Sequence, residues 1–184
     1  MTSMLVALGL WGCGEAAQTA SGEQSIDNWL PLDGEGAWTW RDDGADTAPD
    51  ERTLLHGRDM GQGRIEIRRG ARWADADIVG GLRFSTADGL ELRAMDLAGR
   101  NLGGRPRLLA PALVEEGAVV SDGSWRCDVT IDEEIDTFYA LFDRTLVSTC
   151  EGNQLPGGTW VFAEGMGLVA IISGSTTLDL VAPW

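Results

Sequence analysis

The chain has 184 residues, of which 29 are acidic and 14 basic, and its formal net charge is −15. Lysine is absent, so every basic residue is an arginine. This charge argues against nucleic acid as a partner, because binding phosphates requires a basic face. It also argues against electrostatic docking on anionic lipid, so attachment to a membrane requires a lipid anchor or a partner. A hydrophobic content of 43 % is typical of a globular protein, and the length suffices for one domain with a core.

A short apolar run at residues 4–11 is followed by Gly12 and Cys13. The eight residues of this run are far fewer than the roughly 20 that span a bilayer, and they match the apolar part of a signal peptide. Leu10, Gly12 and Cys13 resemble the lipobox of bacterial lipoproteins. The resemblance implies that residues 1–12 are a lipoprotein signal peptide and that Cys13 is the lipidated residue. The alternative is a chance cysteine in an unstructured N-terminus.

Residues 13–28 follow the lipobox and form the expected tether. They are small and polar with almost no apolar period, which is typical of a flexible linker. The residue after Cys13 is Gly14 rather than aspartate, and by resemblance to known lipoproteins this favours the outer membrane, on either its periplasmic or its surface side. We expect the folded domain to span residues 29–184.

Alternation of apolar and polar residues, interrupted by turns, predicts an antiparallel β domain. Trp38 and Trp40 fall on one face of an alternating segment, and Asp88-Gly89 between two such segments is a strong hairpin signal. Strands are expected at residues 37–41, 52–56, 63–69, 82–85, 90–93, 124–131 and 176–181, with a further hairpin at residues 159–172. No segment is a convincing amphipathic helix. The predicted class is therefore all-β: a curved sheet, a sandwich or a partly open barrel.

Three segments are harder to interpret. Residues 101–111 contain two prolines and are expected to form a loop with a short apolar docking segment at residues 108–110. Residues 132–136 are expected to form an acidic turn. Residues 137–150 permit two interpretations. The spacing of apolar residues from Ile131 to Phe142 is near-helical, whereas the β-branched run at residues 145–149 favours a strand.

Once Cys13 is assigned to the lipid anchor, two cysteines remain, Cys127 and Cys150, and an even number is what disulfide pairing requires. A bridge between them would close a loop of about 24 residues and stabilise the protein by roughly 3 kcal/mol. A metal site is disfavoured because His56 is the only histidine and neither cysteine belongs to a CxxC pair. We therefore predict a structural disulfide and no metal.

His56 is the residue on which a catalytic interpretation depends, because a Ser-His-Asp hydrolase requires one histidine. The chain has no Gly-x-Ser-x-Gly elbow, no phosphate-binding glycine loop and no nicotinamide or flavin fingerprint. Acidic clusters at residues 42–50 and 132–136 offer oxygen ligands for calcium but lack EF-hand spacing. We therefore predict no catalytic residue and no cofactor, and the sequence leaves enzymatic activity open while favouring its absence.

Several tryptophans are candidates to line a cleft for a sugar or a lipid, although such side chains more often fill the core of a β domain. The candidates are Trp38, Trp40, Trp73 and Trp160.

Short motifs near both ends of the domain resemble a group of small bacterial envelope lipoproteins of unknown function. They are Pro31-Leu32, Gly34 or Gly36, and Trp38-x-Trp40 near the start, and Trp160 with Gly165-x-Gly167-Leu168-Val169 near the end. The resemblance implies an all-β domain tethered in the envelope and brings no catalytic residues. We expect a non-enzymatic outer-membrane lipoprotein whose domain binds an envelope protein, glycan or lipid. The alternatives are an envelope hydrolase using His56 or an acidic pair, and a periplasmic lipid carrier with a Trp-lined cavity.

Overall fold

The computed structural model describes residues 24–32, 34, 36–42, 54–97, 100–101, 105–152, 158–173 and 176–183. Regular structure in these residues is almost entirely β, so the expected all-β class is confirmed. The strands are β1 (Gln24–Ser25), β2 (Ala37–Asp42), β3 (Leu54–Asp59), β4 (Arg64–Arg69), β5 (Asp77–Ser85), β6 (Leu90–Leu97), β7 (Arg100–Asn101), β8 (Arg107–Ala110), β9 (Leu113–Val114), β10 (Val119–Ser121), β11 (Trp125–Ile131), β12 (Ile135–Asp136), β13 (Leu141–Phe142), β14 (Thr145–Gly152), β15 (Gly158–Ala163), β16 (Gly167–Ser173) and β17 (Thr176–Pro183). Two short 3-10 helices are η1 (Ile26–Asn28) and η2 (Trp73–Asp75).

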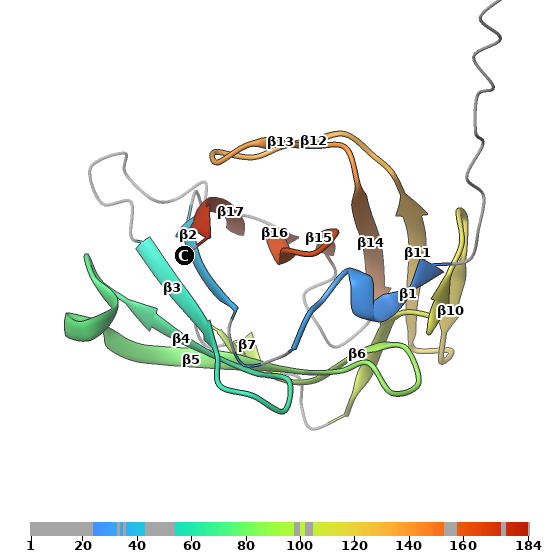
Figure 1. Cartoon of the computed structure of the whole chain (residues 1–184). Helices are drawn as coiled ribbons and strands as arrows, with labels where there is room; N and C mark the ends of the chain where they lie inside the picture. The colour runs from blue at the N-terminus through green and yellow to red at the C-terminus, as the bar shows by residue number, and fades with distance from the viewer. Residues whose placement is uncertain are drawn as a thin grey trace, which may run out of the picture.

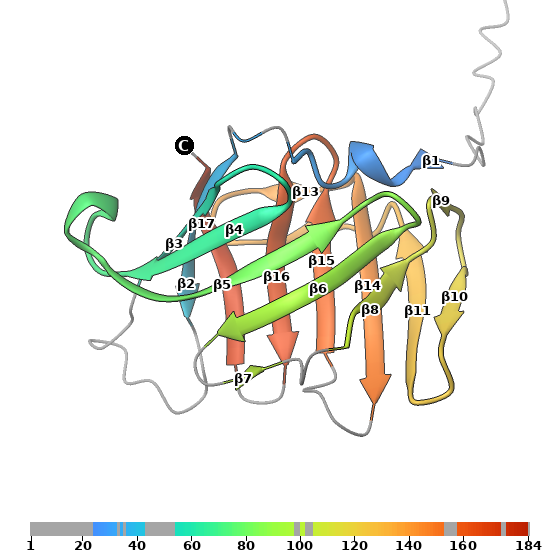
Figure 2. The same cartoon turned by 90° about the horizontal axis from the view of Figure 1, so that it is seen from below.

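One antiparallel sheet dominates the fold and curls into a nearly closed barrel (Figure 1). Within the described residues, twelve strands follow a single path in the order β10-β11-β14-β15-β16-β17-β2-β3-β4-β5-β6-β7, and β8 pairs with β6 off this path. The last strand, β17, pairs with β2, so segments from the two ends of the chain lie side by side in the barrel wall. Seen from below, β4 to β6 cross obliquely in front of β14 to β16 (Figure 2). The core lies between these two halves of the wall.

Side-chain alternation decides which residues fill the barrel. On β4, Ile65 and Ile67 are buried, whereas Arg64 and Glu66 lie on the opposite face of the strand. Successive side chains of a strand point to opposite faces, so one face of each wall strand supplies the core and the other faces outward. Burying each large apolar side chain contributes roughly 1.5–3 kcal/mol, which makes this interior the main source of stability.

The interior accommodates two stacked tryptophans from β2. A Cβ on Gly57 would lie 2.3 Å from ring carbons of Trp40, so the glycine on β3 leaves the space that this indole occupies. The indole N–H groups of Trp38 and Trp40 donate to the backbone carbonyls of Met166 and Leu168, at 2.8 and 3.1 Å. Both rings are therefore buried without leaving these donors unsatisfied.

The N-terminal described segment lies across one end of the barrel (Figure 1). Ile26 and Trp29 are buried, and the N–H of Gly165 in the β15–β16 turn donates to the carbonyl of Asn28 at 2.7 Å. Residues 24–28, which we expected to belong to the tether, therefore pack against the barrel. A single apolar residue, Ile26, gives no periodic pattern from which a packed segment could be predicted. Its burial in η1 nevertheless anchors the segment.

Other sequence expectations also require correction. Residues 101–111 are not only a loop, because they contain β8, and the acidic turn at residues 132–136 continues into β12. The helical alternative for residues 137–150 is wrong, since this stretch contains β13 and β14. β10 was not expected at all. β8, β10, β12 and β13 have only two to four residues each, so their local pattern carries little signal.

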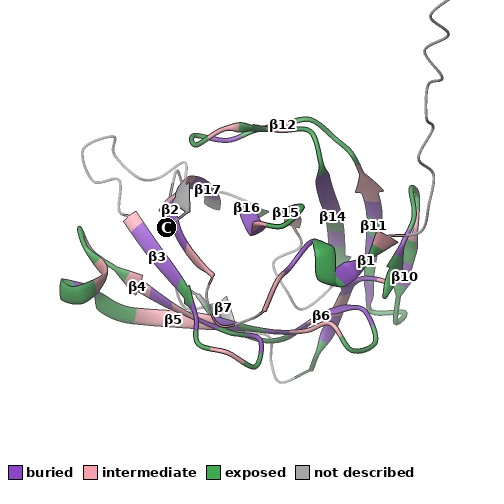
Figure 3. Cartoon of the chain, in the orientation of Figure 1, coloured by how far each residue is buried: buried purple, intermediate pink, exposed green. Residues whose placement is uncertain are grey.

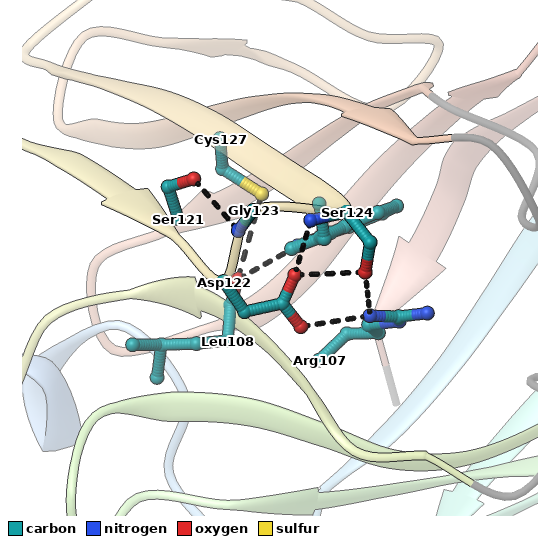
Figure 4. Close-up of polar contacts among 8 residues, drawn as sticks. Arg107, Leu108, Ser121, Asp122, Gly123, Ser124 and Cys127 are labelled. Atoms are coloured by element: carbon teal, nitrogen blue, oxygen red, sulfur yellow. Dashed lines mark hydrogen bonds and ion pairs between the residues drawn. The ribbon is translucent and has the colours of Figure 1, made fainter.

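The barrel closes at a seam between β6–β8 on one side and β10–β11 on the other (Figure 4). Arg107 on β8 donates through Nη1 to Asp122 Oδ2 at 2.8 Å and to the Ser124 hydroxyl at 3.3 Å. The indole N–H of Trp125 donates to the carbonyl of Leu108 at 3.0 Å. These polar contacts connect β8 to the start of β11, and among the described strands no β-ladder pairs these two sides of the seam.

Candidate functional site

The four tryptophans suggested as a ligand cleft do not share one face of the barrel wall. Trp38, Trp40 and Trp160 are buried in the interior, and the rings of Trp38 and Trp40 stack with centroids 5.9 Å apart. Trp73 lies in η2, where the guanidinium of Arg68 on the outer face of β4 stands 4.5 Å from its ring centroid. Three of the four side chains therefore belong to the core, the interpretation that the sequence favoured.

His56 lies on β3 with its ring buried. Its Nδ1 is 3.0 Å from the hydroxyl of Thr39 on β2, and its Nε2 is 2.9 Å from the carbonyl oxygen of Gly70. A carbonyl oxygen can only accept, so Nε2 carries a hydrogen and donates it to Gly70. Both ring nitrogens are engaged in contacts that tie β2 and β3 to the segment after β4. This arrangement supports a structural role for His56.

The predicted disulfide between Cys127 and Cys150 is confirmed. The two cysteines stand directly opposite each other on β11 and β14, with Cα atoms 4.1 Å apart, and both are buried. The disulfide therefore links two neighbouring strands of the wall from inside the barrel. Cys13 lies outside the described residues, so its lipidation stays a prediction.

The acidic clusters are only partly described. Asp42 ends β2, and residues 43–50 lie outside the described residues. In the second cluster Asp132 is 3.6 Å from Arg144, which also forms an ion pair with Glu164 at 3.0 Å. Within the part of the chain that the structure describes, no group of three or more His, Cys, Asp or Glu side chains is arranged to hold a metal ion.

A two-stranded hairpin, which we call the arm (residues 132–144, with β12 and β13), is inserted between the neighbouring wall strands β11 and β14. Figure 1 shows the arm crossing outside the barrel over the ends of β15 to β17. Val147, Val161 and Ala170 lie on the outer face of the wall, opposite to core residues in their strands, and are nevertheless buried. The arm thus adds a third layer over this part of the sheet.

The end of the arm is held against β17 and β2. The N–H of Tyr139 donates to the carbonyl of Leu180 at 2.9 Å, and the N–H of Phe138 donates to Asp179 Oδ1 at 3.2 Å. The guanidinium of Arg41 stands 3.6 Å from the centroid of the Phe138 ring. These contacts position the end of the arm even though its side chains are largely exposed.

Three apolar side chains are exposed at the end of the arm, and we call them the arm tip: Phe138 at 62 %, Tyr139 at 48 % and Leu141 at 57 %. Figure 3 shows the arm mostly exposed, whereas β14 and β16 are mostly buried. Exposed apolar residues scattered singly are normal, whereas three within four positions on one hairpin are a candidate interaction surface. The same hairpin carries four exposed acidic residues, which we call the acidic rim: Glu133, Glu134, Asp136 and Asp143. The arm thus combines an apolar tip with exposed carboxylates.

Sequence reasoning missed the arm tip as a functional candidate. The available signal was a run of aromatic residues between two groups of acids at residues 132–143. We interpreted its spacing as a possible helix face, which would have buried the same side chains.

No protein-family model, no curated protein and no solved structure matches the chain. The resemblance to small envelope lipoproteins therefore stays a prediction. Within the described residues, no helix has the length and apolar character needed to cross a bilayer.

Proposed function

We propose that this protein is a lipid-anchored outer-membrane lipoprotein that acts by binding rather than by catalysis, and that the arm tip engages a protein partner in the bacterial envelope. The observation that carries the proposal is the exposure of Phe138, Tyr139 and Leu141 on an element that projects outside the barrel wall. Aromatic side chains of this kind are enriched among the residues that dominate binding energy at protein interfaces.

The interior of the barrel supports surface binding over the two alternatives. A lipid carrier needs an apolar cavity, whereas Trp38, Trp40 and Trp160 occupy the interior with their own rings. A hydrolase using His56 needs the imidazole to reach a substrate, whereas this ring is buried and holds Thr39 and Gly70. With the interior filled and His56 buried, a partner would bind at the outer surface of the barrel.

The rim of the arm tip favours a particular partner chemistry. The carboxylates of Glu133, Glu134, Asp136 and Asp143 are exposed on the same arm and repel an anionic lipid surface. A protein with an apolar groove bordered by lysine or arginine fits both the centre and the rim. Complementary rim charges would mainly accelerate association and confer specificity, while the aromatic side chains would supply most of the affinity.

The proposed anchor leaves the arm tip accessible. β1 and the free end of the arm lie on opposite sides of the barrel in Figure 1. The segment between Cys13 and Gln24 spans at most about 35 Å when fully extended at ~3.3 Å per residue. A lipid on Cys13 would therefore attach the domain to the membrane from its β1 side, which is not the side that carries the arm tip.

The partner proposal is tested by comparing two triple variants in the native envelope. The arm-tip variant is Phe138→Ser/Tyr139→Ser/Leu141→Ser. The matched control replaces three similarly exposed apolar residues elsewhere, Ile78→Ser/Leu113→Ser/Val119→Ser. After crosslinking and affinity capture, we expect wild type and control to recover the same protein, and the arm-tip variant to recover about tenfold less or lower still. Equal recovery by both variants would overturn the assignment of the arm tip.

The anchor is tested separately by labelling cells with a palmitate analogue. Wild type should incorporate the label and fractionate with the outer membrane, whereas Cys13→Ser should not be labelled. The Cys127→Ser/Cys150→Ser variant serves as the control for losing a cysteine elsewhere and should label as wild type does. Equal labelling of Cys13→Ser and wild type would contradict the lipoprotein proposal without bearing on the arm tip.

A further inference from the structure

A pocket of about 390 Å³ opens at the outside of the β3–β4 turn. It is lined by Met60, Gly61, Gln62, Arg64 and Arg83. The strands that carry it lie on the opposite side of the barrel from the arm (Figure 1), so it is a separate surface from the one proposed above.

The two arginines of this pocket stand directly opposite each other on β4 and β5. Opposed side chains on antiparallel strands have Cβ atoms roughly 4.5–5.5 Å apart, and like charges in this position destabilise the sheet. No ion pair or hydrogen bond joins the guanidinium group of Arg64 or of Arg83 to a residue that the structure describes. Other exposed arginines in the same chain are paired, as Arg93 is with Glu91 at 2.7 Å. Among the described residues of this acidic protein, the two guanidinium groups therefore have no paired carboxylate.

The turn beside these arginines is rigidly shaped. Gly61, Gln62 and Gly63 are consecutive and all have positive φ, at 79°, 55° and 71°. The buried carboxylate of Asp59 accepts the N–H of Gly61 at 2.8 Å and, through its other oxygen, the N–H of Gly34 at 2.8 Å. A left-handed backbone at the non-glycine Gln62 costs of order 1 kcal/mol, and it persists because its surroundings hold it. The turn that forms one side of the pocket is therefore held in place by the protein itself.

We infer that this pocket binds an oxyanion, a phosphate, sulfate or carboxylate group, between Arg64 and Arg83. Guanidinium groups present forked donors that match the oxygens of such anions, and one anion between the two would remove their mutual repulsion. Met60 adds an exposed apolar wall, which suits a ligand that carries the oxyanion on a small organic group. Because the net charge of −15 repels anions at long range, binding depends on the local attraction of the two guanidinium groups.

The inference is tested by recording amide chemical shifts while titrating inorganic phosphate, sulfate or acetate against sodium chloride of equal ionic strength. We expect saturable shifts at Gly61 and Gln62 with at least one of the three anions. The Arg64→Gln/Arg83→Gln variant should lose about tenfold or more in affinity, while Arg126→Gln, which removes an exposed arginine elsewhere, should bind as wild type does. The dispersion of the variant spectra reports whether each is folded, and Arg83→Gln alone provides a milder test.

A second series distinguishes a soluble anion from a lipid headgroup. Vesicles of phosphatidylcholine are compared with vesicles that also contain phosphatidylglycerol, with the same shifts as readout. Saturation by free anions identifies a soluble ligand, and an effect of phosphatidylglycerol alone identifies a headgroup; both depend on the two arginines and support the inference. Absence of saturable shifts with all anions and both vesicles, or unchanged affinity in Arg64→Gln/Arg83→Gln, would overturn it.

Discussion

The guanidinium of Arg107 lies 2.8 Å from the carboxylate of Asp122, and this ion pair joins β8 to the turn before β11 across the seam of the barrel. The two partners are unequally exposed, at 5 % for the Arg107 side chain and 52 % for that of Asp122. The Nε of Arg107 is buried and has no hydrogen-bond partner. A buried cation thus depends on an exposed anion, which makes the two positions unequal in their effect on stability.

We predict that Asp122→Ala destabilises the protein more than Arg107→Met. The aspartate variant leaves a buried guanidinium without its carboxylate, whereas methionine preserves the apolar length of the side chain and leaves Asp122 in contact with water. Urea unfolding followed by tryptophan fluorescence gives both midpoints. A larger loss for Arg107→Met would show that the arginine contributes mainly through packing.

Asp122 should also make stability depend on pH. Its pKa is held below the ordinary value of 3.8 by the hydrogen bonds from the Ser124 backbone N–H and hydroxyl, with Arg107 as a smaller favourable contribution. Since the pKa is lower in the folded state, the unfolded chain takes up the proton first as pH falls. The stabilisation is therefore present above about pH 4 and disappears below it. The difference in unfolding free energy between wild type and Asp122→Asn should shrink as pH falls through this range, and a difference independent of pH would contradict the prediction.

The Cys127–Cys150 bridge should contribute about 3 kcal/mol, because it closes a loop of 23 positions in the unfolded chain. The oxidised wild type and the Cys127→Ala/Cys150→Ala variant are compared by urea unfolding. Wild type unfolded in the presence of a reductant should approach the variant. If the variant is as stable as the oxidised protein, the bridge is dispensable for the fold.

Gly57→Ala should destabilise by about 1–3 kcal/mol, the usual cost of overpacking a core. The added methyl group would lie 2.3 Å from ring carbons of Trp40. Trp40→Phe shortens the ring system, so the cost of Gly57→Ala should be smaller in that background. A double-mutant cycle measures this coupling, and purely additive effects would mean that the clash is relieved elsewhere.

Arg83→Gln should raise the unfolding free energy by roughly 0.5 kcal/mol, because it removes a like-charge pair facing across two strands. The gain should fall as salt is added, since screening already weakens the repulsion in wild type. Arg126→Gln should give no such gain, because Arg126 forms an ion pair with Asp128. A loss of stability in Arg83→Gln would indicate that the two arginines do not repel each other.

Local pattern predicted the elements that are set by neighbouring residues. The Asp88-Gly89 turn and its flanking alternation identified the β5–β6 hairpin, and the alternation at residues 63–69 identified β4. The pairing of Cys127 with Cys150 followed from the parity of the cysteines once Cys13 was set aside. The same kind of evidence failed for the arm, because two-residue strands show no period and their aromatic residues fitted a helix equally well.

The sequence by itself determined the all-β class, most of the wall strands and the disulfide, because each depends on alternation, turn chemistry or residue counts. Only the tertiary structure decided the positions of the candidate sites, which arise from contacts between distant segments. Trp38 reaches a carbonyl 128 positions away at Met166, and this places the indole in the core rather than in a cleft. Strand register likewise set Arg64 opposite Arg83, and the path of the arm left Phe138 exposed beside Arg41. The strand register and the path of the arm depend on the packing of the whole barrel. They cannot be predicted from a short stretch of sequence.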